Sequence, residues 1–148
     1  MIASERITVP VEAVHRSARI AENVGLVCSG LAVLFLVFDT VLKVLKLAPA
    51  IEGTMALGFP ADSVQWIGIV ELACVVLYVV PRTSVFGGLL LTGYLGGAVA
   101  AHVRISNPLL THTLFPVYVA LFLWGGLYLR EKRLRDLVPL RRRTPPPV

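Results

Sequence analysis

Four long runs of apolar residues alternate with short polar or proline-containing segments along this chain. The runs cover residues 24–47, 64–80, 84–105 and 113–129. A hydrocarbon core of about 30 Å takes about 20 helical residues to cross, so each run has roughly the length of a membrane-spanning helix. The pattern therefore predicts an all-α, integral membrane four-helix bundle, built as a single multi-pass domain.

The connection after the first run carries several residues that end helices. Pro49 is expected to end the first span, because proline cannot continue the hydrogen-bond ladder of a helix. Residues 50–63 are too short and too polar to cross a membrane, and they predict a short surface helix. The apolar positions of that helix are Ile51, Met55 and Leu57, and Gly58 and Pro60 are expected to end it.

The other two connections are shorter. Residues 81–83 (Pro-Arg-Thr) are expected to form a tight turn, so the second and third spans are predicted to be an antiparallel hairpin. Residues 107–108 (Asn-Pro) are expected to end the third span, and Pro116 falls in the first turn of the fourth.

The composition supports a membrane protein and excludes several other classes. Of the 148 residues, 56% are hydrophobic and only 16% are charged, with a mean hydropathy of +0.78. Soluble domains carry about 25% charged residues, so an ordinary soluble enzyme and a disordered regulator are excluded. Cys28 and Cys74 lie in separate apolar runs and form no CxxC motif, which excludes a disulfide-stapled secreted module.

Charge divides the chain into three segments and predicts its orientation. Residues 1–22 form a polar N-terminal segment, residues 23–135 the membrane domain, and residues 136–148 a basic, proline-rich tail. Eleven of the 14 Lys and Arg residues fall on the side that holds both termini, and three fall on the other side. Cytoplasmic loops carry the excess of Lys and Arg, so both termini are predicted to be cytoplasmic. The net charge of +5 thus indicates basic segments at the cytoplasmic surface of the bilayer rather than binding of nucleic acid.

Five ionisable residues of the predicted spans are informative, and all lie in the outer half of the membrane. They are Asp39, Lys43, Glu71, His102 and Arg104. A charge at membrane depth costs at least about 2.5–3.5 kcal/mol on insertion scales, so such residues usually face the bundle interior and have a partner. These five are therefore predicted to form a polar pocket that binds a ligand.

The spacing of these residues predicts only one of their partnerships. Asp39 and Lys43 are four residues apart and are expected to pair along one helix face. Glu71 has no cation one turn away, so its partner must come from another helix, namely His102, Lys43 or Arg104. Without such a partner, Glu71 is expected to be a neutral hydrogen-bond donor.

The residues leave four interpretations of this cluster open. It could be a buried polar clamp that fixes the register of the helices, or a pocket for a small molecule or a lipid head group that opens outward. A metal or haem site made of His102, His112 and a carboxylate is a third interpretation, although this pair matches no specific ligand pattern and no metal site is predicted. A proton relay is the fourth.

A stripe of small residues marks one face of the third span. Gly93, Gly97 and Ala101 recur every four residues and leave that face without side-chain bulk. Such a face lets another helix approach closely, so these residues are predicted to pack against a neighbouring helix of the bundle. Dimerisation through the same face is the alternative.

Five segments taken together resemble the DoxX-like family of small bacterial membrane proteins. They are FDTVLKVLK, ALGFPADS, GIVELACVVLYVVPRT, LLLTGYLGGAVAAHVR and HTLFPVYVALFLWGGLYLR. The resemblance covers about residues 24–135 and implies a four-helix protein of the bacterial inner (plasma) membrane. Relatives include a subunit associated with a quinol-oxidising enzyme and animal chaperones that help assemble membrane receptors. The resemblance implies no catalytic residue.

Two functions are consistent with these observations. The first is a non-enzymatic protein that binds a small apolar or amphiphilic ligand, or a membrane-protein partner or second copy, and assists assembly. The second is a membrane subunit of a quinone-linked oxidoreductase, in which Glu71 or His102 exchanges the proton of the quinol. The absence of an internal redox motif favours the first.

Overall fold

The structure, a computed structural model, describes residues 11–137, and this part of the chain contains helices and loops but no strand. This confirms the predicted all-α class. The elements in chain order are α1 (Val11–Val44), α2 (Ala48–Ala56), α3 (Ser63–Val79), α4 (Ser84–Arg104), the π-helical turn η1 (Leu109–Thr113), α5 (Phe115–Arg130) and α6 (Lys132–Leu137).

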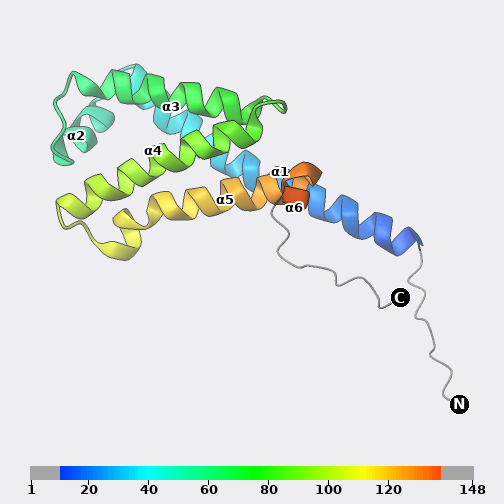
Figure 1. Cartoon of the computed structure of the whole chain (residues 1–148). Helices are drawn as coiled ribbons and strands as arrows, with labels where there is room; N and C mark the ends of the chain where they lie inside the picture. Colours follow the sequence, from blue (N-terminus) through cyan, green and yellow to red (C-terminus); the bar gives the residue numbers. More distant parts are fainter. Residues whose placement is uncertain (1–10, 138–148) are drawn as a thin grey trace, which may run out of the picture.

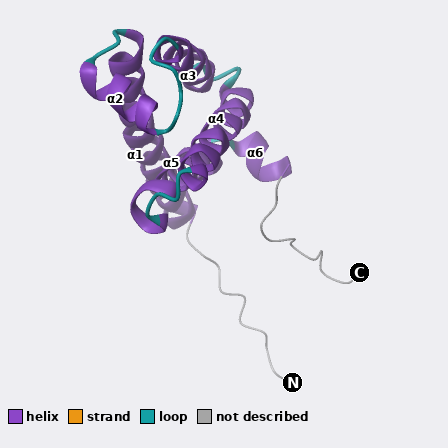
Figure 2. Cartoon of the chain, turned by 90° about the vertical axis from the view of Figure 1, so that its left-hand side faces the viewer, coloured by secondary structure: helices purple, strands orange, loops and turns teal. Residues whose placement is uncertain are grey.

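The four longest helices pack side by side in a closed ring. The helix α1 packs against α3 and α5, α3 packs against α4, and α4 packs against α5. Figure 1 shows α2 at one end of this bundle and α6 at the other. Figure 2, which looks from the α2 end, shows α1, α3, α4 and α5 following one another around the bundle.

The described helices are suited to lipid on their outer faces. Three stretches, Arg16–Val44, Ser84–Arg104 and Leu109–Arg130, are long and apolar enough to cross a membrane. The helix α3 is also apolar but has 17 residues, slightly fewer than the other three. Large apolar side chains point outward, including Leu34, which is 68% exposed, and Phe38, which is 62% exposed. Water would make such a surface costly, whereas lipid solvates it.

The first helix differs from its prediction at both ends. It begins at Val11 rather than near residue 24, so residues 11–22 are part of α1 and not a separate segment. Residues 1–10 of the predicted N-terminal segment, and residues 138–148 of the predicted tail, lie outside the described residues. Residues 11–22 are mixed in polarity, but they contain no residue that breaks a helix, so the helical conformation continues through them.

Pro49 was predicted to end α1, but it does not. The helix closes earlier, at Lys46, whose φ of 53° is left-handed. The N–H of Lys46 donates to the carbonyl of Lys43 (3.1 Å), and the N–H of Leu47 donates to that of Leu42 (2.9 Å). This is a Schellman motif, which satisfies the last carbonyls of a helix. Pro49 instead lies in the first turn of α2, where its missing N–H has no cost.

The predicted short helix within residues 50–63 is confirmed as α2, which starts two residues earlier. Gly58 ends it with a φ of 82°, as its flexibility predicted. A Schellman motif also ends α4 at Ser106, whose φ is 55°. Asn107 and Pro108 were predicted to end the third span. The helix instead ends before them, at Arg104.

The predicted hairpin of the second and third spans is confirmed. Only Val80, Pro81, Arg82 and Thr83 separate α3 from α4. Gly87 lets the two helices approach each other, because a Cβ added there would lie 2.2 Å from the backbone nitrogen of Tyr78. No larger residue fits at this position without moving a helix.

The small-residue stripe of α4 does not pack as predicted. A Cβ added to Gly93 or Gly97 would meet no atom within 4 Å, so no neighbouring helix of the described chain covers these two positions. Ala101 is buried. The glycines in close helix contacts lie elsewhere, because a Cβ at Gly25 would lie 2.8 Å from the carbonyl oxygen of Gly126 on α5.

Candidate functional site

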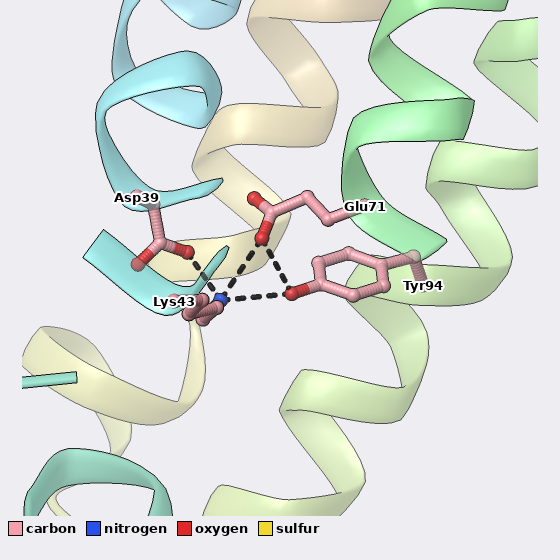
Figure 3. A network of polar contacts seen from close by, with 4 residues as sticks. All are labelled: Asp39, Lys43, Glu71 and Tyr94. Carbon is pink, nitrogen blue, oxygen red and sulfur yellow. Dashed lines mark hydrogen bonds and ion pairs between the residues drawn. The ribbon is translucent and has the colours of Figure 1, made fainter. Parts of the chain in front are cut away.

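Polar groups from three helices meet inside the bundle (Figure 3). Lys43 Nζ on α1 donates to Asp39 Oδ2 on the same helix at 2.5 Å. It also donates to Glu71 Oε2 on α3 at 3.0 Å and to Tyr94 Oη on α4 at 2.8 Å. Tyr94 Oη in turn donates to Glu71 Oε2 at 2.8 Å. We call these four residues the Lys43 network.

Close packing of α1 and α3 brings the network together. Gly68 lies one turn before Glu71, and a Cβ added there would lie 2.7 Å from Lys43 Cβ. The missing side chain lets the two backbones approach, so the long Lys43 side chain reaches the Glu71 carboxylate. A register fixed by backbone contact holds the polar groups in place without help from a loop.

The Glu71 carboxylate is only half satisfied. Its side chain has an exposed fraction of 0%, against 15% for Lys43 and 33% for Asp39. Oε2 accepts both hydrogen bonds, whereas Oε1 is buried and has no hydrogen-bond partner among the described residues. A buried polar atom without a partner costs about 1–3 kcal/mol. Oε1 is therefore a vacant acceptor inside the bundle.

The network also has an excess of negative groups. It contains two carboxylates, Asp39 and Glu71, against one ammonium group. All three hydrogens of that ammonium group are used within the network, by Asp39, Glu71 and Tyr94. The donor for Oε1 must come from outside the network, as a proton or as a hydrogen bond from a water molecule or a bound ligand.

The pairing predicted from sequence is confirmed for three residues. Asp39 and Lys43 form the expected ion pair one helical turn apart, and Lys43 is the cation that Glu71 obtains from another helix. The sequence left this cation open among three candidates, and the structure selects one. The two other candidates, His102 and Arg104, have different partners.

Tyr94 belongs to the network and was missed. Its neighbours Gly93 and Gly97 were predicted only as a packing face. A signal was present, because Tyr94 precedes His102 by eight residues and therefore lies on the same face of α4. A tyrosine in the middle of a predicted span needs a partner for its hydroxyl group, as ionisable residues do.

His102 and His112 form a second polar group near the end of α4. Their ring centroids are 6.1 Å apart in an edge-to-face arrangement. The Nδ1 atom of His102 shares a hydrogen bond with Asn107 Nδ2 (2.7 Å), and that of His112 with Thr111 Oγ1 (2.8 Å). Among residues 11–137, no group of three or more His, Cys, Asp or Glu side chains could hold a metal ion.

Arg104 does not join the Lys43 network. Its guanidinium group donates to the carbonyl of Leu57 and lies 5.6 Å from the centre of the Phe59 ring. Both contacts are with the segment that follows α2. Arg104 therefore ties the end of α2 to the end of α4, which makes it a structural anchor of the segment that covers the network.

A recess of about 470 Å³ connects these groups. Its wall includes Asp39, Lys43, Glu71, Tyr94 and His102, and it continues to His112 and Asn107. The remaining lining is largely apolar and comes from α1, α2, α4 and α5; it includes Phe35, Leu36, Phe115 and Val119. Four of the five predicted pocket residues therefore line one recess, and Arg104 lies outside it.

The recess has a size and a lining that are common in ligand sites. Ligand sites in proteins occupy about 300–1,000 Å³ and combine apolar walls with a few convergent polar groups. The Lys43 network supplies one vacant acceptor, and the histidine pair supplies further polar atoms. Cys28 and Cys74 are free thiols, and neither lines the recess.

Comparison with known proteins gives one match. A family model described as the DoxX-like family matches residues 27–126. No curated protein and no solved structure matches the chain. The family match covers most of α1 and α5 and all of α2, α3 and α4, and therefore includes every residue of the Lys43 network. Together with the apolar helices, it shows that this chain is a membrane protein that belongs to the DoxX-like family.

Proposed function

We propose that this protein binds a small amphiphilic molecule in the recess beside the Lys43 network and acts as a ligand-binding or assembly protein rather than as an enzyme. The observation that carries this proposal is the vacant Oε1 atom of Glu71, which is fully buried in a residue that lines the recess. A ligand that donates a hydrogen bond to this atom would remove the cost of leaving it unpaired.

The charges of the network define the head group that fits. Asp39 and Glu71 together outnumber Lys43 by one charge when both are ionised, and Lys43 has no hydrogen left to donate. An anionic head group would meet repulsion and would find no free donor in the network. The ligand therefore carries a neutral or cationic head group with at least one N–H or O–H.

In the membrane, we place all four long helices across the bilayer. A 17-residue helix such as α3 is about 26 Å long and falls within the usual range for a span. Both termini are then cytoplasmic, in agreement with the distribution of Lys and Arg. The Lys43 network and the recess open toward the outer side of the bacterial inner membrane.

Native mass spectrometry of mildly extracted protein tests the proposal, with wild type beside Glu71→Gln. Lys43 and Tyr94 donate to one oxygen of residue 71, so a glutamine there must turn its oxygen to them and its NH₂ group to the recess. A donor then replaces the acceptor, and we expect binding to weaken by about tenfold to a hundredfold. Glu52→Gln is the matched control, because Glu52 is exposed on α2 and does not line the recess.

Two results would overturn the proposal. One is the presence of only heterogeneous phospholipid on wild type and on both variants. The other is a molecule of fixed mass that Glu71→Gln retains as well as Glu52→Gln does. Circular dichroism of all three proteins shows whether any loss of ligand is caused by a loss of the fold.

A membrane subunit of a quinone-linked oxidoreductase is the second candidate. It is favoured by one observation, that Glu71 and His102 line the same recess and could each take a proton from a quinol. A quinone as the bound mass, with quinol oxidation by the native complex lost in Glu71→Gln, would support this function. A membrane partner that fails to assemble in the deletion strain, with quinol oxidation unchanged, would support the assembly role instead.

A further inference from the structure

A second, apolar recess of about 310 Å³ runs along α4. Its floor is the small-residue stripe of Gly93, Gly97 and Ala101, and its sides include Ile67 of α3 and Phe59 of the segment after α2. We call this recess the glycine groove. Its lining is apolar except where it reaches Lys43, Tyr94 and Thr54.

The floor of the groove is bare backbone. No atom of the described chain lies within 4 Å of a Cβ built at Gly93 or at Gly97, and both residues are exposed. From Gly93 to Ala101 the stripe extends about 12 Å along the helix. That length lies within one leaflet, because half of the hydrocarbon core is about 15 Å thick.

The groove ends at the Lys43 network. Lys43, Tyr94, Thr54, Leu57 and Ala98 line both recesses, so the groove and the recess beside Glu71 meet along these five residues. Figure 3 shows Lys43 and Tyr94 converging on Glu71 from their two helices. Glu71 lines the recess and not the groove, so a molecule in the groove reaches this carboxylate through the part that the two share.

We propose that the glycine groove holds the hydrocarbon chain of a single-chain amphiphile whose hydrogen-bond donor head group binds at Glu71. The chain lies over Gly93 and Gly97 and remains continuous with the lipid of the outer leaflet, so the ligand enters sideways from the bilayer. This inference rests on the proposed function and adds to it the class of ligand and the route of entry.

The test uses 1-monopalmitoylglycerol with a diazirine near the middle of its chain, which is a neutral, single-chain donor probe. Gly97→Leu places a bulky side chain on the floor of the groove, and Gly93→Leu does the same one turn earlier. Gly96→Leu is the matched control, because Gly96 is also exposed with no atom within 4 Å but does not line the groove. A Cβ at any of the three positions meets no atom of the described chain within 4 Å.

We expect photocross-links in wild type and in Gly96→Leu to fall on the walls of the groove, at Ile67 or Phe59. The yield should fall about tenfold in Gly97→Leu and Gly93→Leu, because the chain loses the burial of about two methylene groups. Monoacetylglycerol, which has the same head group but almost no chain, should bind these two variants as it binds wild type.

Three results would overturn the inference. Equal cross-linking of Gly97→Leu and Gly96→Leu would show that the hydrocarbon chain lies elsewhere. If Glu71→Gln still lost binding of the glyceride in that case, the proposed function would remain intact. A change of native mass from dimer to monomer in Gly97→Leu, with unchanged binding, would make the stripe an interface between two copies. Failure of wild type to bind either glyceride in competition would overturn the donor head group on which both proposals depend.

Discussion

Replacing Lys43 with methionine removes the one cation that two carboxylates share. The bonded oxygens of Asp39 and Glu71 lie 2.5 and 3.0 Å from the same Nζ atom, so they are at most about 5.5 Å apart. At an effective dielectric constant of about 20, two like charges at that distance repel each other by about 3 kcal/mol. Removing one partner of a buried ion pair generally costs about 3–5 kcal/mol. We therefore expect Lys43→Met to lower the free energy of unfolding by about 3 kcal/mol.

A double-mutant cycle measures this quantity. Wild type, Lys43→Met, Glu71→Gln and the double variant are unfolded by titration with sodium dodecyl sulfate in mixed micelles, and helicity is followed by circular dichroism. Glu71→Gln alone keeps both hydrogen bonds on its amide oxygen but makes the acceptor neutral, which weakens the bond from Lys43 by about 1 kcal/mol. In the Lys43→Met background it also removes the repulsion, so the double variant should be more stable than the sum of the two single effects predicts.

Lys46→Met is the control for Lys43→Met. Lys46→Met removes an exposed lysine from the end of α1, outside the network, and should change stability by no more than about 0.5 kcal/mol. If Lys43→Met costs no more than Lys46→Met, or if the two single effects add without coupling, the carboxylates do not share a charge at this lysine. The electrostatic description of the network would then be wrong.

Two further predictions concern the backbone. Gly87→Ala should destabilise the fold by about 1–3 kcal/mol, because its Cβ would lie 2.2 Å from the Tyr78 nitrogen; the adjacent Gly88→Ala, whose nearest neighbour is 3.6 Å away, should stabilise α4 by up to about 1 kcal/mol. The same titration compares them, and equal effects would contradict the close approach of α3 and α4. Ser106→Gly should raise stability by about 1 kcal/mol, because serine is strained at a φ of 55°; a decrease would mean that the Ser106 side chain contributes more than the strain removes.

The contacts that sequence predicts well are local ones. Asp39 and Lys43 pair because four residues make one helical turn, and this needs no knowledge of the rest of the fold. The cation of Glu71 depended on the relative depth of two helices, which the Gly68 contact sets to within one turn. Hydropathy locates a span to within several residues, so it could name three candidates and could not choose between them.

The wrong predictions of helix ends and of the packing face also have physical causes. Lys46 and Ser106 end two helices in a left-handed conformation that their residue types disfavour, so no sequence preference marks these positions. Gly93 and Gly97 have the spacing of a packing face, but no neighbouring helix of the described chain contacts them. The close helix contacts are made at other glycines, namely Gly25, Gly68, Gly87 and Gly126. Spacing alone does not show which glycines lie at a helix contact. The sequence shows the stripe, but only the three-dimensional structure shows that its two glycines are exposed.

The unbroken length of α1 has a mechanical consequence. The helix has 34 residues and is about 50 Å long, well beyond the thickness of the hydrocarbon core. One stiff rod therefore carries the exposed Arg16 and Arg19 near its first end and Asp39 and Lys43 near its last. A rotation or a piston-like shift applied to either end moves the other by the same amount. The α1 residues of the network and the two arginines therefore lie on one continuous element, about 30–40 Å apart along its axis.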